Sequence, residues 1–239
     1  MAEFKKILEE TLLNEGGFSD DPEDNGGMTL FGIARSKNPQ WAGWREVDQI
    51  LKINGWNSKN KSNWPLIAKA CKKISSVESF YRTNYWNLIK GENIFANSIA
   101  QTIFDYGVNT GIGTAIKNVQ RTLKIVDDGD FGPKTLETLN KFIMTESLYK
   151  WSEEFTLRKL VRYVKIVTNE SENIKFIFGW TSRSFENLEA MYDLDLVMEP
   201  SFNELYSYVK AGRNDKALRQ DTDKCMYLVT KCLKQYGIM

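Results

Sequence analysis

Apolar residues recur three and four positions apart along most of the chain, which is the spacing of one face of an α-helix. The first such stretch covers residues 3–14, and Gly16 and Gly17 end it, as glycine does just past a helix C-terminus. Ser75 and Glu78 fit a capping box that begins another helix. The same spacing predicts further helices over residues 65–74, 75–86, 96–110, 112–124, from Pro133 onward, and over 146–167, 173–194, 201–211 and 215–236.

Two regions depart from this helical pattern. Residues 18–32 are rich in Asp, Pro, Asn and Gly, which favours turns and a small hairpin. An irregular, tryptophan-rich region follows, for which burial in the core is favoured and an exposed binding face is the alternative. Its tryptophans are Trp41, Trp44, Trp56 and Trp64. The pattern as a whole predicts a mainly α fold with a small irregular or β element after the first helix.

Length and composition are those of a soluble globular protein. The 239 residues allow one large domain or two small ones, with 42% hydrophobic and 26% charged residues. The formal net charge is +1, and Lys and Arg are spread along the chain rather than clustered. This distribution argues against a nucleic-acid partner, which calls for a basic patch or stripe.

The chain contains no histidine, which excludes Ser-His-Asp triads and HExxH zinc sites. Acid–base chemistry must therefore come from Asp, Glu, Lys, Tyr or Cys side chains. The three cysteines, Cys71, Cys225 and Cys232, form no CxxC pair, so buried reduced thiols are favoured over a zinc site or a disulfide framework. We expect neither a metal nor another cofactor.

No apolar stretch approaches the roughly 20 residues that a membrane-spanning helix needs, so we expect no stable membrane insertion. Residues 1–13 contain acidic residues within their apolar part and have no small-residue cleavage site, which is unlike a secretory signal peptide. We therefore expect synthesis in the cytoplasm without a signal peptide.

The segment from Glu15 to Thr29 combines a carboxylate at a helix end with a glycine-rich turn that holds further acids. Glycosidic bond cleavage needs an acid that protonates the leaving oxygen and a carboxylate that activates water or stabilises the oxocarbenium ion. The helix C-terminus carries a negative field, which we expect to raise the pKa of Glu15 and to suit it to the acid role. Asp24, in a polar turn, is expected to stay ionised, with Thr29 holding a water beside it.

A structural interpretation competes with this catalytic one. Glu15 can be a solvated helix-end residue, and the acids of the turn can simply cap it. The role of Asp24 is also contested, because Asp20 and Asp21 lie in the same segment.

The segment resembles the signature of glycoside hydrolase family 108, whose members are muramidases. It reads Glu15-Gly-Gly-Phe18, then Asp21-Pro-Glu-Asp-Asn-Gly-Gly-Met-Thr29, then Gly32-Ile33, with Phe18 in place of the more usual tyrosine. The resemblance implies a lysozyme-like helical fold and places the family's catalytic glutamate on Glu15. By looser similarity to phage-type lysozymes, Asp24 and Thr29 take the water-positioning roles.

The resemblance extends over roughly residues 4–190. Tyr81-Arg82-x-x-Tyr85-Trp86 is similar to a helix that closes the family's catalytic part. Later stretches resemble a linked peptidoglycan-binding module: Phe104-Asp105-x-x-Val108-Asn109-x-Gly111, Ala115–Gln120, Asp128-Gly129-x-Phe131-Gly132-Pro133-x-Thr135 and Gly179-Trp180-x-x-Arg183. This implies a lysozyme-like catalytic region over 1–92, a helical peptidoglycan-binding-like region over 93–194 packed against it, and extra C-terminal helices of unknown role over 195–239.

The resemblance also suggests substrate-binding residues, each with a structural alternative. Tyr85 and Trp86 are candidates for stacking on sugar rings, although core packing applies to at least one of them. Asn109 is a candidate sugar-binding or scaffold residue, and Asp105 is equally a buried structural partner. Trp180 and Arg183 are candidates for binding the wall, with core packing and pairing to a core acid as their alternatives.

These features together predict an N-acetylmuramidase of the lysozyme or endolysin type, which hydrolyses the β-1,4 bonds between N-acetylmuramic acid and N-acetylglucosamine. Its partner is bacterial peptidoglycan, and we expect a monomer that acts on the cell wall or in the periplasm after release or pore formation. Two alternatives remain: a lytic transglycosylase that leaves anhydro-muramic ends, and a non-catalytic wall-binding or secretion-accessory protein.

Overall fold

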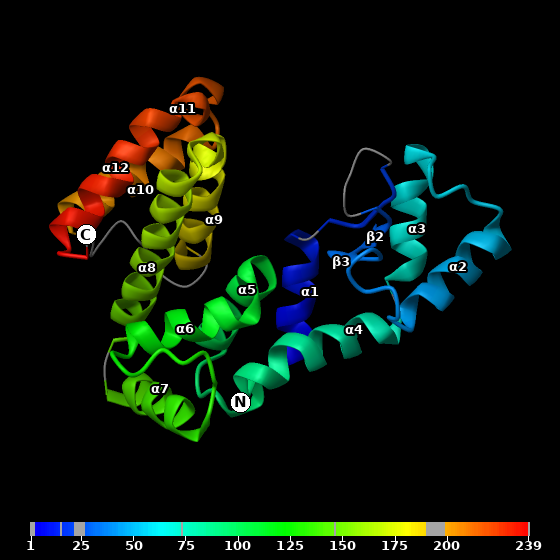
Figure 1. The fold of residues 1–239 in the computed structure, drawn as a ribbon, viewed down its shortest axis with the longest axis horizontal. Helices are drawn as coiled ribbons and strands as arrows, with labels where there is room; N and C mark the ends of the chain where they lie inside the picture. Colours follow the sequence, from blue (N-terminus) through cyan, green and yellow to red (C-terminus); the bar gives the residue numbers. More distant parts are fainter. Residues whose placement is uncertain are drawn as a thin grey trace. The chain divides into compact units, whose positions relative to one another are not determined.

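Helices and one small sheet make up the described part of the chain, which confirms the mainly α fold predicted from the sequence. The computed structural model describes residues 3–14, 16–21, 27–72, 74–145, 147–189 and 199–238. These residues fall into two compact units, Met1–Ile112 and Gly113–Met239, whose elements are labelled in Figure 1.

The first unit places a three-stranded antiparallel sheet directly after its first helix. The sheet has the order β1-β2-β3, with Phe18 opposite Leu30 and Leu30 opposite Ile33. Its strands are β1 (Phe18–Ser19), β2 (Thr29–Leu30) and β3 (Ile33–Ala34). Its helices are α1 (Phe4–Asn14), α2 (Gly43–Asn54), α3 (Trp64–Cys71), α4 (Ser75–Tyr81) and α5 (Asn97–Thr110), joined by the short turns of helix η1 (Lys61–Asn63), η2 (Arg82–Trp86), η3 (Asn87–Ile89) and η4 (Gly91–Asn93).

An aromatic cluster holds α1, η2 and α5 together. The ring of Phe104 on α5 lies 5.9 Å from that of Phe4 and 5.8 Å from that of Trp86. Phe4 and Trp86 are themselves 5.2 Å apart. This packing makes α5 part of the first unit, so the unit extends to Ile112, whereas the sequence placed a boundary after residue 92.

Two local expectations from the sequence are wrong. The tryptophan-rich region contains the regular helix α2, whose buried residues are Gly43, Trp44 and Val47. Helix α4 does begin at Ser75, but its N-cap is Ile74 and no side chain caps it, so the expected capping box is not formed. Glu78 instead pairs with Arg82, 3.6 Å away.

The second unit begins within α6 (Ile112–Thr122) and includes a group of four helices. These are α8 (Leu148–Asn169), α9 (Ile177–Glu189), α10 (Pro200–Gly212) and α12 (Thr222–Gln235), which lie side by side in Figure 1. The remaining elements of the unit are α7 (Pro133–Thr145), η5 (Ser171–Phe176) and α11 (Lys216–Gln220).

The turn between α6 and α7 is held by one buried amide. Gln120 is 1% exposed and donates to the Asp128 carboxylate at 2.7 Å and to the Asp130 carbonyl at 2.9 Å, while its own oxygen accepts from the Gly129 amide at 2.9 Å. Residues 127–135 are therefore organised by hydrogen bonds within the unit.

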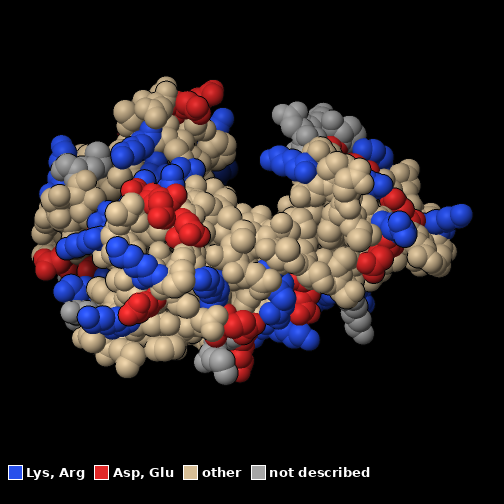
Figure 2. Space-filling model, turned by 60° about the horizontal axis from the view of Figure 1, so that its bottom comes forward, with Lys and Arg blue, Asp and Glu red and all other residues tan. Residues whose placement is uncertain are grey.

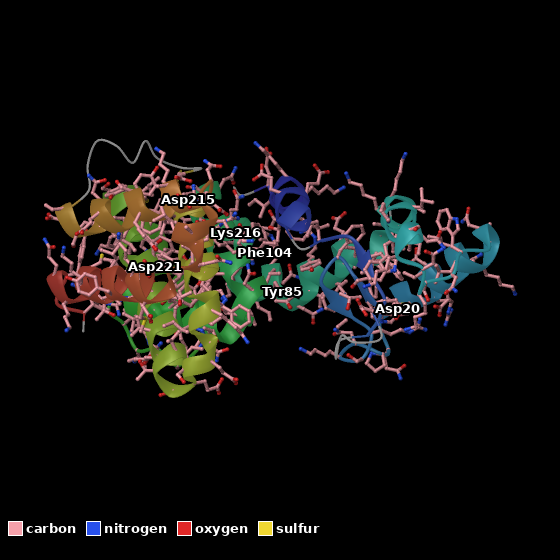
Figure 3. The ribbon with its side chains drawn as sticks, turned by 90° about the horizontal axis from the view of Figure 1, so that it is seen from above. Asp20, Tyr85, Phe104, Asp215, Lys216 and Asp221 are labelled. Carbon is pink, nitrogen blue, oxygen red and sulfur yellow. The ribbon has the colours of Figure 1, made fainter. Side chains whose placement is uncertain are left out.

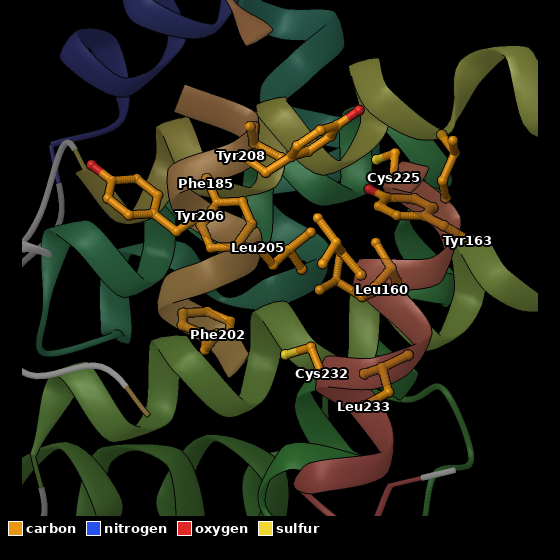
Figure 4. Packing of buried hydrophobic residues seen from close by; sticks show 14 of the residues in the cluster. Leu160, Tyr163, Phe185, Phe202, Leu205, Tyr206, Tyr208, Cys225, Cys232 and Leu233 are labelled. Carbon is orange, nitrogen blue, oxygen red and sulfur yellow. The ribbon is translucent and has the colours of Figure 1, made fainter. Parts of the chain in front are cut away.

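The C-terminal helices share one hydrophobic core with α8 and α9. Phe202 and Leu205 of α10 and Leu233 of α12 are buried in the same cluster as Leu160 and Phe185 (Figure 4). Residues 199–238 thus complete the bundle of the second unit. In the described part of the chain, no helix is both long and apolar enough to cross a membrane.

The three cysteines are free and buried, as the sequence predicts. Burial raises the pKa of the Cys71 thiol to about 11. The pKa values of Cys225 and Cys232, on α12, rise to about 12 for the same reason. Because a low dielectric disfavours the charged thiolate, all three side chains act as small apolar core residues.

The shared core predicts that α10 is needed for the stability of the second unit. Phe202→Ala removes a fully buried ring, so we expect the free energy of unfolding to fall by about 3–5 kcal/mol. Tyr227→Ala is the matched control, because this α12 side chain is 63% exposed. Urea denaturation measures both, and equal stability of the two variants would contradict the role given to α10.

Candidate active site

The predicted catalytic glutamate directly follows the last residue of α1. The helix ends at Asn14, and Gly16 then adopts a φ of +75°, which turns the chain toward β1. Glu15 and Asp24 themselves lie outside the described residues, and their catalytic roles stay predictions. The start of α1 is held by Phe4, which lies in the aromatic cluster.

The hairpin of β2 and β3 presents Phe31 to this region. Phe31 and Gly32 form the two-residue turn with φ values of +47° and +81°, the pattern of a type I′ hairpin turn. A phenylalanine rarely adopts positive φ, so this backbone is strained unless its surroundings hold it. The Phe31 amide donates to the Gly17 carbonyl at 2.7 Å, and its carbonyl accepts from the Tyr81 hydroxyl at 2.5 Å.

Strand β1 and helix α3 approach closely at Gly17. A Cβ atom added to Gly17 would lie 2.8 Å from the Cβ of Ala68, which is closer than real Cβ atoms come. The second glycine of the Glu-Gly-Gly motif therefore has a packing role. It lets α3 lie directly against the segment that follows Glu15.

A pocket of about 670 Å³ opens beside these elements, which is within the size range of small-ligand sites. Its wall combines apolar and small residues with three charged side chains. The described residues that line it are Glu9, Leu12, Gly16, Gly17, Phe31, Ala68, Lys69 and Lys72. Because Gly16 and Gly17 line it, the pocket adjoins Glu15 along the chain.

The two aspartates that compete with Asp24 are both engaged in ion pairs. Asp20 is 3% exposed, and its carboxylate accepts a hydrogen bond from Lys59 at 2.6 Å (Figure 3). Asp21 pairs with Lys61, also at 2.6 Å. Both lysines come from the loop before α3, so these pairs tie that loop to the segment that follows β1.

Thr29 begins β2, five residues after Asp24 in the sequence. It is half-buried, and its hydroxyl donates to the Gly27 carbonyl at 3.1 Å. A hydroxyl oxygen that donates its hydrogen can still accept one from water. The water-positioning role of Thr29 stays a prediction.

Tyr85 and Trp86 are adjacent in sequence but differ in burial. Trp86 is fully buried, and its ring contacts Phe4 and Phe104, so the expectation that it binds a sugar is corrected to a core role. Tyr85 is half-buried, and its ring stacks at 5.6 Å on Tyr81 beside Phe104 (Figure 3). Of this pair, only Tyr85 keeps an exposed surface for a substrate.

Helix α5 contributes Asp105 and Asn109 to the same unit. The Thr11 hydroxyl of α1 donates to the Asp105 carboxylate, which joins the two helices one turn before Glu15. Asn109 is exposed and donates to the Asp105 carbonyl at 2.7 Å. Asp105 therefore has a structural role, while the sugar-binding role of Asn109 stays a prediction.

Trp180 and Arg183 belong to the second unit. The half-buried ring of Trp180 lies between Tyr163, at 5.3 Å, and Phe176, at 5.7 Å. Arg183 is exposed one turn further along α9. Sequence reasoning missed Phe176, which is 47% exposed and extends this aromatic row to the surface.

The pocket also contains residues that sequence reasoning did not single out. The sequence did not indicate Lys69 and Lys72 as pocket residues. Apart from Ala68, the other side chains of the pocket come from α1 and the hairpin, which are far from these lysines in the sequence. Phe31 could have been noted as the residue before Gly32 in a short hairpin. Within the described ranges, no group of three or more acidic or cysteine side chains could hold a metal ion.

Comparison with known proteins defines the class to which this fold and pocket belong. Residues 8–111 match the family model of glycosyl hydrolase 108, and residues 114–185 match that of the predicted peptidoglycan domain. Residues 8–111 are therefore a glycosyl hydrolase 108 domain, and residues 114–185 are a predicted peptidoglycan domain that follows it. The protein is a glycosyl hydrolase that acts on peptidoglycan.

The division between the two matches falls at the boundary of the two compact units in the chain, between Ile112 and Gly113. The solved structure of Brucella abortus SagA is similar, with 23% sequence identity and a TM-score of 0.52 over 81% of this chain and 98% of that chain. At this identity the likeness supports the fold. No curated protein matches the chain.

The contact between Gly17 and Ala68 predicts a clash that can be relieved. Gly17→Ala should lower the free energy of unfolding by about 1–3 kcal/mol through overpacking. The same substitution should cost less in an Ala68→Gly background, which itself loses about 1 kcal/mol because glycine is a poor helix former. Gly113→Ala, where an added Cβ meets nothing within 4 Å, is the control. Denaturation curves of the two single variants and the double variant measure this coupling, and strictly additive losses would refute the packing role.

Proposed function

We propose that the protein is an N-acetylmuramidase that hydrolyses the β-1,4 bond between N-acetylmuramic acid and N-acetylglucosamine. The observation that carries this proposal is the 670 Å³ pocket beside the Glu-Gly-Gly segment of a glycosyl hydrolase 108 domain. Its apolar and small residues can lie against a sugar ring, and Glu15, which precedes Gly16 in the sequence, is the proposed acid for the glycosidic oxygen. The proposed place of action is the cell wall or periplasm.

In the proposed reaction, Glu15 gives its proton to the leaving glycosidic oxygen as the bond to the anomeric carbon breaks. Asp24, as a carboxylate, orients a water for attack on that carbon and accepts the proton that the water loses. Thr29, at the end of the same turn, helps to hold the water. The ion pairs of Asp20 and Asp21 support the choice of Asp24, because each of those two aspartates already pairs with a lysine.

The role of Glu15 predicts a large loss of activity without a loss of fold. Glu15→Gln keeps the size of the side chain but removes the acid, so we expect the rate to fall on the order of 10²–10⁴-fold. Clearing of a purified cell-wall suspension and release of reducing ends measure the rate. Glu3→Gln, an exposed residue before α1, is the matched control. Wild-type rates in Glu15→Gln would remove Glu15 from the mechanism.

Mass spectrometry of the products tests the hydrolytic step itself. Hydrolysis leaves a reducing N-acetylmuramic acid end, whereas attack by the sugar's own hydroxyl leaves an anhydro end. Reducing muramic ends are expected. Anhydro ends, or reducing N-acetylglucosamine ends, would overturn the proposed bond specificity or reaction type.

The choice among the three aspartates gives a separate prediction. Asp24→Asn should lower the rate on the order of 10²-fold and leave the unfolding free energy unchanged. Asp20→Asn should do the reverse, with a loss of about 1–3 kcal/mol of stability as its buried pair with Lys59 is weakened. The two sets of measurements are turbidity rates and urea unfolding. If Asp20→Asn is inactive but stable and Asp24→Asn is active, the roles must be exchanged.

A further inference from the structure

The pocket lined by Gly16 and Gly17 has an uneven charge distribution among its described residues. Its charged described residues are Lys69 and Lys72 on the α3 side and Glu9 on α1. Lys69 and Lys72 are three positions apart at the end of α3, which places them on the same side of the helix. Both are exposed. The α3 side of the pocket therefore offers two exposed ammonium groups to a ligand.

The other described residues of the pocket wall are apolar or small. Leu12, Phe31 and Ala68 line it together with the two glycines of the motif. Gly17 and Ala68 bring α3 against the chain that follows Glu15, so the two lysines extend from the helix that forms this wall. A ligand that fits must present an uncharged surface to the apolar wall and an anionic group to α3.

We propose that Lys69 and Lys72 bind a carboxylate on the substituent of the muramic acid ring. This inference rests on the proposed function and names the feature of the substrate that the pocket selects. N-acetylmuramic acid differs from N-acetylglucosamine by a lactyl ether. This ether ends in a carboxylate or continues into a stem peptide with its own carboxylates. The shared ligand chemistry is a carboxylate linked to the ring at this position.

The charges around the pocket determine the direction and the approximate size of the change in ligand binding that we expect from each substitution. Exposed ammonium–carboxylate pairs are weak and are screened by salt within a Debye length of about 8–10 Å. Glu9 lines the same pocket and repels a bound carboxylate. Neutralising the lysines should therefore weaken binding, and neutralising Glu9 should strengthen it. A general loss of fold would move all variants in the same direction.

Lysines near a helix C-terminus also interact favourably with the helix dipole, so a purely structural role must be separated from binding. The neutral pair Lys69→Gln with Lys72→Gln removes both charges. The pair Lys69→Arg with Lys72→Arg keeps them. The control pair, Lys37→Gln with Lys52→Gln, removes two exposed lysines of the first unit that do not line the pocket.

Binding is measured by fluorescence polarisation with labelled soluble glycan strands, using the full chain in a Glu15→Gln background so that no strand is cut. One set of strands keeps its stem peptides, and a second set has lost them to an amidase, which leaves free lactyl carboxylates. Chitin oligosaccharides, which have no carboxylate, are the third ligand. The same lysine variants with Glu15 intact give KM and kcat on the first two ligands.

We expect the neutral pair to raise the Kd and the KM for a carboxylate-bearing strand about 3–10-fold with little change in kcat. The arginine and control pairs should stay near wild type, and Glu9→Gln should lower the Kd. The wild-type Kd should rise with added salt more steeply than that of the neutral pair. A loss only on stem-bearing strands assigns the carboxylate to the peptide, and a loss only on stem-free strands assigns it to the lactyl group.

Three results would overturn the inference: an unchanged Kd in the neutral pair, an equal loss in the arginine pair, or an equal loss on chitin oligosaccharides. The binding measurements do not depend on cleavage. If wild type releases no reducing muramic ends, the proposed function fails, while the binding data still decide the role of the lysines. If wild type does release them and the neutral pair matches it in Kd and KM, only the role of the lysines fails.

Discussion

The packing of Phe104 against Phe4, Tyr81 and Trp86 is the contact on which the first unit depends. It joins the start of α1 to α5 and to the turn of π-helix after α4. A short helix such as α1 has little stability of its own, so its position comes from this buried contact. The aromatic cluster therefore holds the helix that directly precedes Glu15 in the sequence.

The same unit places its strained backbone beside the pocket. Phe31 is held at positive φ by the Gly17 carbonyl on one side and the Tyr81 hydroxyl on the other. Tyr81 also belongs to the aromatic cluster, so the cluster and the hairpin are coupled through a single side chain.

The basic and acidic side chains on the face in Figure 2 are interspersed, and the pair of lysines in the pocket is a local feature against that background.

Much of the fold follows from the sequence because helical periodicity is a local signal. The spacing of apolar residues correctly predicted α1, α5 and α6, and the glycine-rich segment indicated the hairpin. Helix α2 was missed although Trp44, Val47 and Leu51 recur within it at helical spacing. The C-terminal helices were predicted as helices, but their shared core with α8 and α9 depends on contacts between distant segments.

The candidate site shows the same division between local and distant signals. The motif predicted Glu15 and its turn, but the sequence could not separate Tyr85 from Trp86, since burial is decided by packing against Phe4 and Phe104. It also could not separate the three aspartates, because Lys59 and Lys61, which engage two of them, come from a distant loop.

The burial of all three cysteines has a practical consequence. Alkylating reagents attack the thiolate, and these thiols are both enclosed and kept protonated at neutral pH. A single cysteine introduced on the surface would therefore react with a maleimide dye while the native three stay unmodified. The natural chain is thus suited to site-specific labelling, and fluorescence can follow its arrival on cell-wall fragments without first replacing any core residue.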